Sequence, residues 1–161
     1  MKVQRLVSSL TLAISLIAVA GFPGFTPLAQ SSKNAVSLFA IMELEAGSSG
    51  HFNTKATINN RPVDVLVDTG ATAVALSYED ASRIGLKPRS LTYDVKVSTA
   101  NGEGKAARVM LREVEIGSVR VQNVEGIVLQ EGALRGTLLG MSFLSRLRSF
   151  KVEDGKLILK N

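Results

Sequence analysis

The stretch of sequence that decides the fold reads VLVDTGAT, from Val65 to Thr72, and places a carboxylate directly after an apolar run. The continuous run 65–67 predicts a strand that is buried on both faces. A carboxylate at the end of such a strand leaves water only if other groups satisfy it. Gly70 lets the backbone pass close and offer an N–H group, and Thr69 adds a hydroxyl. The stretch predicts a carboxyl group held rigidly in an apolar cleft; the alternative is that Asp68 only begins a turn, with its side chain bonded to nearby backbone.

Short strands separated by turn signals are expected on both sides of this stretch, which is the pattern of an all-β domain. A helix is expected to begin at Ser77, which can cap it, with Asp80 at the capping-box spacing and Gly85 as the stop. A shorter helix is expected over residues 141–147. The strands that apolar runs and alternation predict are 51–58, 63–67, 73–76, 91–99, 106–116, 119–129, 150–152 and 157–159.

Two further motifs stand at a distance from the first. Asn101 and Gly102 form the strongest short hairpin signal, and they place a hairpin tip over residues 100–104. Near the C-terminus, residues 137–140 read TLLG and precede the second expected helix. This order of strand, glycine and helix repeats that of the VLVDTGAT stretch, so the chain has a weak internal symmetry.

Composition limits the chemistry that is open to the 161-residue chain. It has no cysteine and a single histidine, His51. Disulfides, Cys-ligated zinc, thiol nucleophiles and multi-histidine metal sites are therefore excluded, and a Ser-His-Asp triad could use only His51. The net charge is +5 without a basic run of five or more, which does not favour a nucleic-acid partner. The remaining groups are carboxylates, hydroxyls, the backbone, lysine and arginine.

The N-terminal residues 1–29 have no acidic side chain, and their basic ones are Lys2 and Arg5. Residues 18–20 read AVA, the small-x-small form of a signal peptidase site, but the uncharged stretch continues through residue 29. A cleaved signal peptide and a membrane anchor over residues 6–28 are both left open. Either way we expect export to the periplasm, soluble or anchored in the inner membrane. Residues 30–50 are expected to be a flexible linker, in which 36–44 could form a short strand, and residues 51–161 the folded domain.

Taken in order, these motifs resemble the retropepsin-like aspartic proteases, specifically the single-domain bacterial clan AA type, over roughly residues 51–160. The resemblance implies a mostly β, closed-barrel-like retropepsin (acid protease) fold with one or two short helices. The sequences that carry it are VDTGAT (67–72), STANG (98–102) and TLLGMSFL (137–144).

The resemblance also implies roles for individual residues. Asp68 would be the catalytic aspartate of an endopeptidase. The flap tip reads ANGEG and is more charged than a typical viral flap, so the resemblance implies no substrate preference. The implied support of the active-site loop is Thr69, Gly70, Ala71 and Thr72; the implied flap is Thr99, Ala100, Asn101, Gly102, Glu103 and Gly104; the implied floor under the site is Leu138, Leu139 and Gly140.

Aspartic proteolysis needs two carboxyls that share one proton, one acting as base toward a water and the other as acid toward the scissile carbonyl oxygen. The chain contains one such motif. Asp64 falls on the strand face opposite Val63 and Val65, where solvent is expected, and Asp80 suits the first turn of a helix. The second Asp68 is therefore expected from a second chain, in a C2 homodimer whose axis passes through the site.

The expected partner of such a dimer is a peptide or protein substrate, and no metal or cofactor is required. Two alternatives stay open at this point. The chain could be a catalytically silent module of the same fold that binds peptides or proteins, or a scaffold protein of the cell envelope in which the DTG motif is incidental.

Overall fold

The computed structural model describes residues 40–99 and 102–161. All of them belong to one compact unit. The predicted signal or anchor segment, residues 30–39 of the predicted linker, and Ala100 and Asn101 lie outside the described residues. Within the described ranges, no helix is both long and apolar enough to cross a membrane.

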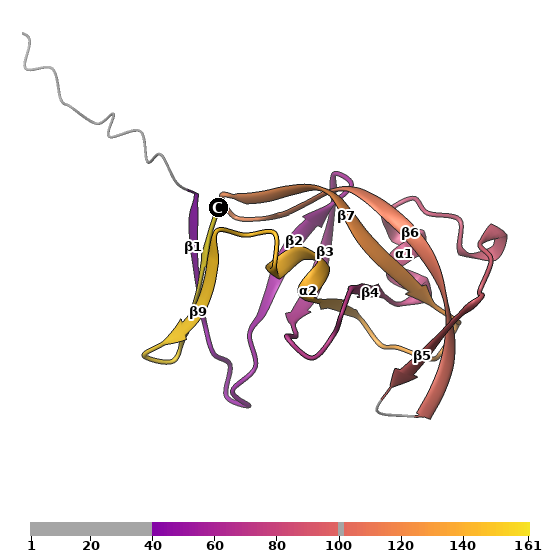
Figure 1. Cartoon of the computed structure of the whole chain (residues 1–161), viewed down its shortest axis with the longest axis horizontal. Helices are drawn as coiled ribbons and strands as arrows, with labels where there is room; N and C mark the ends of the chain where they lie inside the picture. Colours follow the sequence, from indigo (N-terminus) through magenta and orange to yellow (C-terminus); the bar gives the residue numbers. More distant parts are fainter. Residues whose placement is uncertain (1–39, 100–101) are drawn as a thin grey trace, which may run out of the picture. The chain divides into compact units, whose positions relative to one another are not determined.

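A closed ring of six strands forms the body of the fold (Figure 1). Neighbours are hydrogen-bonded in the order β2-β3-β8-β4-β7-β6, and the pairing of β2 with β6 closes the ring. The strand β5 continues this sheet beyond β6 as a hairpin arm. The mostly β, closed-barrel fold is therefore confirmed. The strands of this sheet are β2 (Asn53–Ile58), β3 (Arg61–Val67), β4 (Val74–Leu76), β5 (Val95–Thr99), β6 (Gly102–Ile116), β7 (Val119–Leu129) and β8 (Thr137–Leu139).

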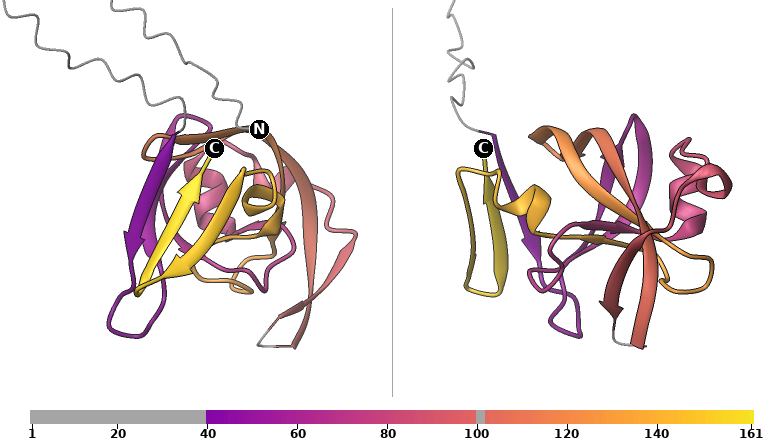
Figure 2. Two further views of the ribbon diagram at one scale, coloured as in Figure 1. Left: turned by 60° about the vertical axis from the view of Figure 1, so that its left-hand side comes forward. Right: turned by 45° about the vertical axis from the view of Figure 1, so that its right-hand side comes forward.

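A separate three-stranded sheet, in the order β1-β10-β9, comprises β1 (Ile41–Glu45), β10 (Lys156–Lys160) and β9 (Ser149–Glu153). Figure 2 shows the indigo strand β1 beside the two yellow strands. Residues 30–50 are expected as a linker in which residues 36–44 could form a strand; the structure has a strand at Ile41–Glu45, and it is part of the fold. The reason is the buried side chain of Leu44, which pairs in register with Leu157 and joins the main core.

Parallel pairing of β3 with β8 brings the two halves of the internal symmetry together. Val65 lies opposite Thr137, and Val67 opposite Leu139. Each strand ends at a turn that contains a glycine, Gly70 after β3 and Gly140 after β8. The two turns, far apart in sequence, therefore leave the sheet side by side.

The first helix, α1 (Tyr78–Arg83), begins and ends as expected. The Ser77 hydroxyl accepts a hydrogen bond from the N–H of Asp80 at 3.1 Å, and Gly85 follows the helix with a φ of +87°. The carboxylate of Asp80 does not complete the capping box. It is buried, and it accepts instead from the Thr137 hydroxyl at 2.8 Å and from Arg83 at 2.5 Å.

The remaining differences from the expected elements are local. The second helix, α2 (Met141–Leu144), is shorter than residues 141–147. A 3-10 turn, η1 (Pro88–Ser90), delays the expected strand 91–99 until Val95. The hairpin tip is narrower than 100–104, because residues 102–104 pair with residues 97–99 as part of β6.

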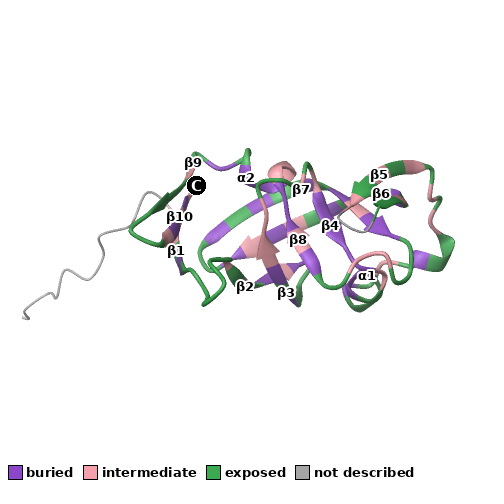
Figure 3. Ribbon diagram, turned by 90° about the horizontal axis from the view of Figure 1, so that it is seen from below, coloured by how far each residue is buried: buried purple, intermediate pink, exposed green. Residues whose placement is uncertain are grey.

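The hydrophobic core has two parts, and Figure 3 shows in purple the buried residues along the strands. The main cluster joins the ring, both helices and the three-stranded sheet. A smaller cluster comprises Ala75, Ala106 and Leu129, with Leu138 and Val97 packed against it. The largest fully buried side chains include Phe143, Ile58, Leu76, Leu111, Ile116, Leu139 and Leu144.

Candidate active site

Asp68 is held at the C-terminal end of β3 by backbone bonds on both sides. Its N–H donates to the carbonyl of Leu139 at 3.1 Å, and its carbonyl accepts from the N–H of Ala71 at 3.3 Å. The carboxylate is half-buried, and its Oδ1 accepts from the N–H of Gly70 at 2.8 Å. The short backbone donor that the sequence predicted from Gly70 is present, so the orientation of the carboxylate is restricted by its own loop.

Gly70 and Thr69 differ in how they serve this loop. A Cβ atom at Gly70 would lie 3.1 Å from Oδ1 of Asp68, a tight contact, so glycine gives the carboxylate its room. The Thr69 side chain is exposed, and none of the hydrogen bonds among the described residues joins its hydroxyl to Asp68 within this chain. The bracing that the resemblance implied is therefore carried by Gly70 in the single chain.

The rest of the loop is tied to the start of α2. The N–H of Met141 donates to the carbonyl of Ala71 at 2.8 Å, and the N–H of Ser142 donates to that of Thr72 at 3.0 Å. The Ser142 hydroxyl accepts from the N–H of Val74 at 2.9 Å and donates to the carbonyl of Glu125 at 2.6 Å. Ser142 thus joins the loop, β4 and β7, a role that sequence reasoning missed because a serine early in a helix is an ordinary residue.

Gly140 is the closest point of contact between the two turns. A Cβ atom there would lie 2.2 Å from the carbonyl oxygen of Ala73 and 2.6 Å from that of Ala71. Both are backbone atoms, so the loop could not keep its position beside a larger residue. Gly140 therefore lies directly against the loop.

The two leucines of the implied floor face different ways. Leu139 is fully buried in the main core, and its carbonyl receives the N–H of Asp68. Leu138 is partly buried and packs against the smaller cluster on the other face of β8. Leu139 therefore holds the loop through its carbonyl, while Leu138 is partly exposed on the opposite face of β8.

A groove of about 560 Å³ opens along β3, and we call it the β3 groove. Leu66 and Leu138, opposite each other in register, contribute apolar side chains to it. Leu66 precedes Asp68 by two residues, and side chains two apart on extended backbone share a face. The β3 groove thus runs along the face from which Asp68 projects. Its lining residues are Asn53, Thr54, Lys55, Asp64, Val65, Leu66, Arg135, Gly136, Thr137 and Leu138.

The hairpin of β5 and β6 carries the residues that were expected to form the flap. The Thr99 hydroxyl donates to the carbonyl of Gly102 at 2.9 Å, and Glu103 and Gly104 pair with Ser98 and Val97. Ala100 and Asn101 lie outside the described residues. Val97 packs against the same small cluster as Leu138, so the hairpin and β8 share this part of the core.

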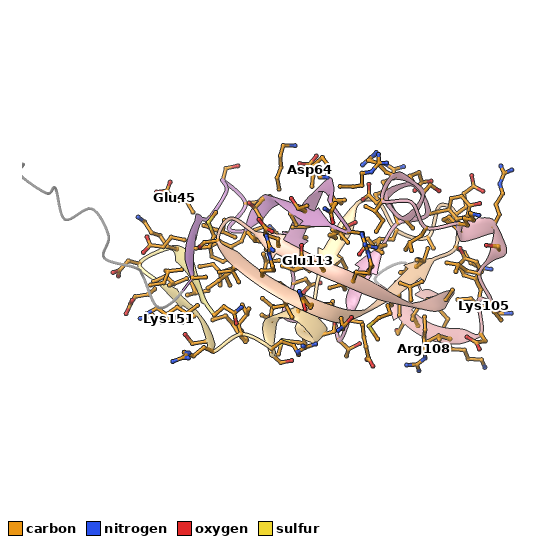
Figure 4. The ribbon with its side chains drawn as sticks, turned by 90° about the horizontal axis from the view of Figure 1, so that it is seen from above. Glu45, Asp64, Lys105, Arg108, Glu113 and Lys151 are labelled. Carbon is orange, nitrogen blue, oxygen red and sulfur yellow. The ribbon has the colours of Figure 1, made fainter. Side chains whose placement is uncertain are left out.

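The other carboxylates considered from the sequence are engaged elsewhere. Asp64 is exposed, as expected; it projects from β3 (Figure 4) and pairs with Lys55 at 2.8 Å. Asp80 is buried in its bonds to Thr137 and Arg83. In the described part of the chain, no three His, Cys, Asp or Glu side chains come together as a metal site. A single chain therefore offers Asp68 without a second carboxyl among these candidates.

Comparisons with known proteins agree with this geometry. Residues 54–146 match the family described as gag-polyprotein putative aspartyl protease. An uncharacterized Sinorhizobium protein from the cobV 5′ region is 46% identical over 113 residues, which cover 70% of this chain and 48% of that protein. This chain therefore spans about half the length of that curated relative.

Two solved structures are also similar. The crystal structure of a retropepsin-like aspartic protease from Rickettsia conorii is 38% identical, with a TM-score of 0.69, covering 76% of this chain and 91% of that one. EIAV protease, in complex with the inhibitor HBY-793, is 19% identical, with a TM-score of 0.52, covering 64% of this chain and 93% of that one. The second likeness concerns the fold alone.

Proposed function

The chain belongs to the retropepsin-like aspartic proteases, and from that premise we propose that it is an endopeptidase that hydrolyses peptide bonds with Asp68. The observation that carries the proposal is the setting of this carboxylate. It is half-buried at the end of β3, receives the Gly70 N–H at 2.8 Å, and stands on a loop bonded to Leu139 and Met141. A carboxyl that is held so needs little reorganisation before it meets a substrate.

The chemistry we propose needs two such carboxyls and one shared proton. The ionised carboxyl removes a proton from water as the water oxygen attacks the scissile carbonyl carbon, and the protonated carboxyl gives its proton to the carbonyl oxygen. When the tetrahedral intermediate collapses, the C–N bond breaks, the leaving nitrogen takes the proton that the first carboxyl removed from water, and a hydroxyl of the intermediate returns a proton to the second carboxyl. Asp64 and Asp80 are committed to other partners, which supports a second copy of the chain as the source of the second carboxyl.

The substrate would bind in an extended conformation between the hairpin of β5 and β6 and the face that bears Asp68 and Leu138. The residues 99–104 would act as the flap over it. No step of this hydrolysis requires a metal or cofactor. The N-terminal residues 6–28 would direct export, as a signal peptide or an inner-membrane anchor; the support is their lack of charge after Lys2 and Arg5.

The first test replaces Asp68 by Asn in the full chain. We expect cleavage of a fluorogenic peptide pool, assayed from acidic to neutral pH, to fall to background, while circular dichroism stays that of the parent. The matched control is Asp154→Asn, an exposed turn residue whose φ of 51° suits asparagine. Full activity in the Asp68→Asn protein would refute the assignment, and retained cellular function without cleavage would favour a scaffold or binding role.

The second test asks whether the site is shared between chains. Parent and Asp68→Asn chains are unfolded together, refolded at a ratio of about one to nine, and assayed. Random pairing of two chains per active site lowers the activity per parent chain to roughly one tenth. Activity that is proportional to the parent chains present would show that one chain suffices and would contradict the dimer.

A further inference from the structure

Arg135 contributes a charge to the β3 groove that the proposed reaction does not use. Its side chain is exposed on the segment before β8 and lines the groove. None of the ion pairs formed among residues 40–99 and 102–161 includes it. A guanidinium presents donors in a fixed planar fork that matches a carboxylate.

The other charges of the β3 groove compensate each other. Lys55 and Asp64 stand on neighbouring strands, and their Nζ and Oδ1 atoms are 2.8 Å apart. Arg135 is the remaining charged residue of the lining, so the groove has a net positive charge. A ligand with one negative side chain is complementary to it.

The position of Arg135 relative to Asp68 sets where that negative side chain would fall. Leu66 and Leu138 form the apolar part of the β3 groove next to the site. Arg135 precedes Leu138 by three residues. Because β8 runs parallel to β3 and Asp68 follows the end of β3, Arg135 lies farther from Asp68 than Leu138 does. Since extended chain advances about 3.3 Å per residue, an acidic side chain at Arg135 belongs about two to four residues from the scissile bond.

We propose that the β3 groove selects peptide substrates with an acidic side chain on one side of the scissile bond, and that Arg135 is the residue that recognises it. This inference rests on the proposed function and names a substrate class for the same site. The apolar part of the groove takes the side chain nearest the scissile bond, and the acidic side chain lies farther along the same extended strand.

The experiment uses a fluorogenic peptide that the parent enzyme cleaves, with Glu, Gln or Lys at each position two to four residues from the bond. We expect kcat/KM for the best Glu peptide to exceed that for its Lys counterpart about three- to tenfold, mainly through KM, as suits an exposed ion pair. The preference should shrink at high salt and reverse in Arg135→Glu. The matched control is Arg89→Glu, an exposed arginine that does not line the β3 groove.

The outcomes separate this inference from the proposed function. If the Gln peptides are cleaved but the Glu-to-Lys ratio is the same in Arg135→Glu, the groove does not select acidic peptides, while the protease assignment stands. Binding of labelled peptides is measured in parallel on the Asp68→Asn protein. A Glu preference in Kd that reverses when Arg135→Glu is added supports the inference without turnover, and equal Kd values overturn it.

Discussion

Replacing Gly140 by Ala tests the contact on which the position of Asp68 depends. The backbone φ of Gly140 is −93°, a value that alanine adopts freely, so the effect is steric. The new Cβ would lie 2.2 Å from the Ala73 carbonyl oxygen, whereas Cβ contacts in proteins essentially never fall under 3.0 Å. The loop must therefore retreat by at least about 0.8 Å. A shift of that size breaks the 2.8 Å bond from Met141 to Ala71 and weakens the bond from Ser142 to Thr72.

Together, the steric clash and the lost hydrogen bonds should lower the free energy of unfolding substantially. Overpacking of a tight contact costs about 1–3 kcal/mol, and each lost backbone hydrogen bond costs about 1 kcal/mol more. We expect the free energy of unfolding to fall by about 2–5 kcal/mol, a large share of the roughly 5–15 kcal/mol that stabilises a folded domain. The peptidase activity should also fall, even under conditions in which the variant is still folded, because the displaced loop carries Asp68.

Urea unfolding followed by far-ultraviolet circular dichroism measures the loss. The control is Gly132→Ala, where no atom lies within 4 Å of the added Cβ and the φ of +78° alone is unfavourable. That backbone strain costs about 1 kcal/mol. If Gly140→Ala is no less stable than Gly132→Ala, the close packing of the two turns does not position the site, and the reasoning is wrong.

Two further predictions concern Ser142 and Tyr93. Ser142→Ala should lower the free energy of unfolding, measured in urea, by about 1–3 kcal/mol, because the Val74 N–H and the Glu125 carbonyl lose the Ser142 hydroxyl as partner. The control, Ser145→Ala, loses one exposed bond to the Met141 carbonyl and should change it by less than about 0.5 kcal/mol. Equal losses in the two variants would contradict the joining role of Ser142. Burial, and to a lesser extent the neighbouring Tyr78, raises the pKa of Tyr93 above 10.0. In the Tyr78→Phe protein Tyr93 is the one tyrosine that remains, so tyrosinate absorbance reports its titration alone. The midpoint should lie above pH 10.0 in the folded protein and fall when the protein unfolds. The stability linked to Tyr93 is thus complete below its unfolded pKa and is lost as pH rises through the higher folded value; a folded midpoint at or below the unfolded one would refute this.

Local sequence was a good guide where one interaction dominates. The Ser77 cap, the Gly85 stop and the separate strands follow from hydrogen bonding and alternation over a few neighbouring residues, and the structure has them. It was a poor guide where a distant partner decides. Residues 41–45 lie in the expected linker, between its polar and its glycine-rich ends, and only the pairing of β1 with β10 makes them part of the fold and buries Leu44. Asp80 looks like an exposed first-turn carboxylate, and Thr137, far along the chain, takes it into the interior.

By itself, the sequence excluded thiol chemistry and multi-histidine metal sites, and it predicted that Asp68 ends a buried strand and that Gly70 stands where its N–H can meet the carboxylate. These properties depend on residue type and on separations of one to three residues. Tertiary structure decided that β3 and β8 pair in parallel, that Gly140 and Ser142 hold the loop of Asp68, and that Leu138 and Arg135 share a groove beside it. Those contacts join residues some 70 positions apart. The loop of Asp68 meets the turn after β8 only when the ring of strands closes, because closure buries the apolar faces of the strands together.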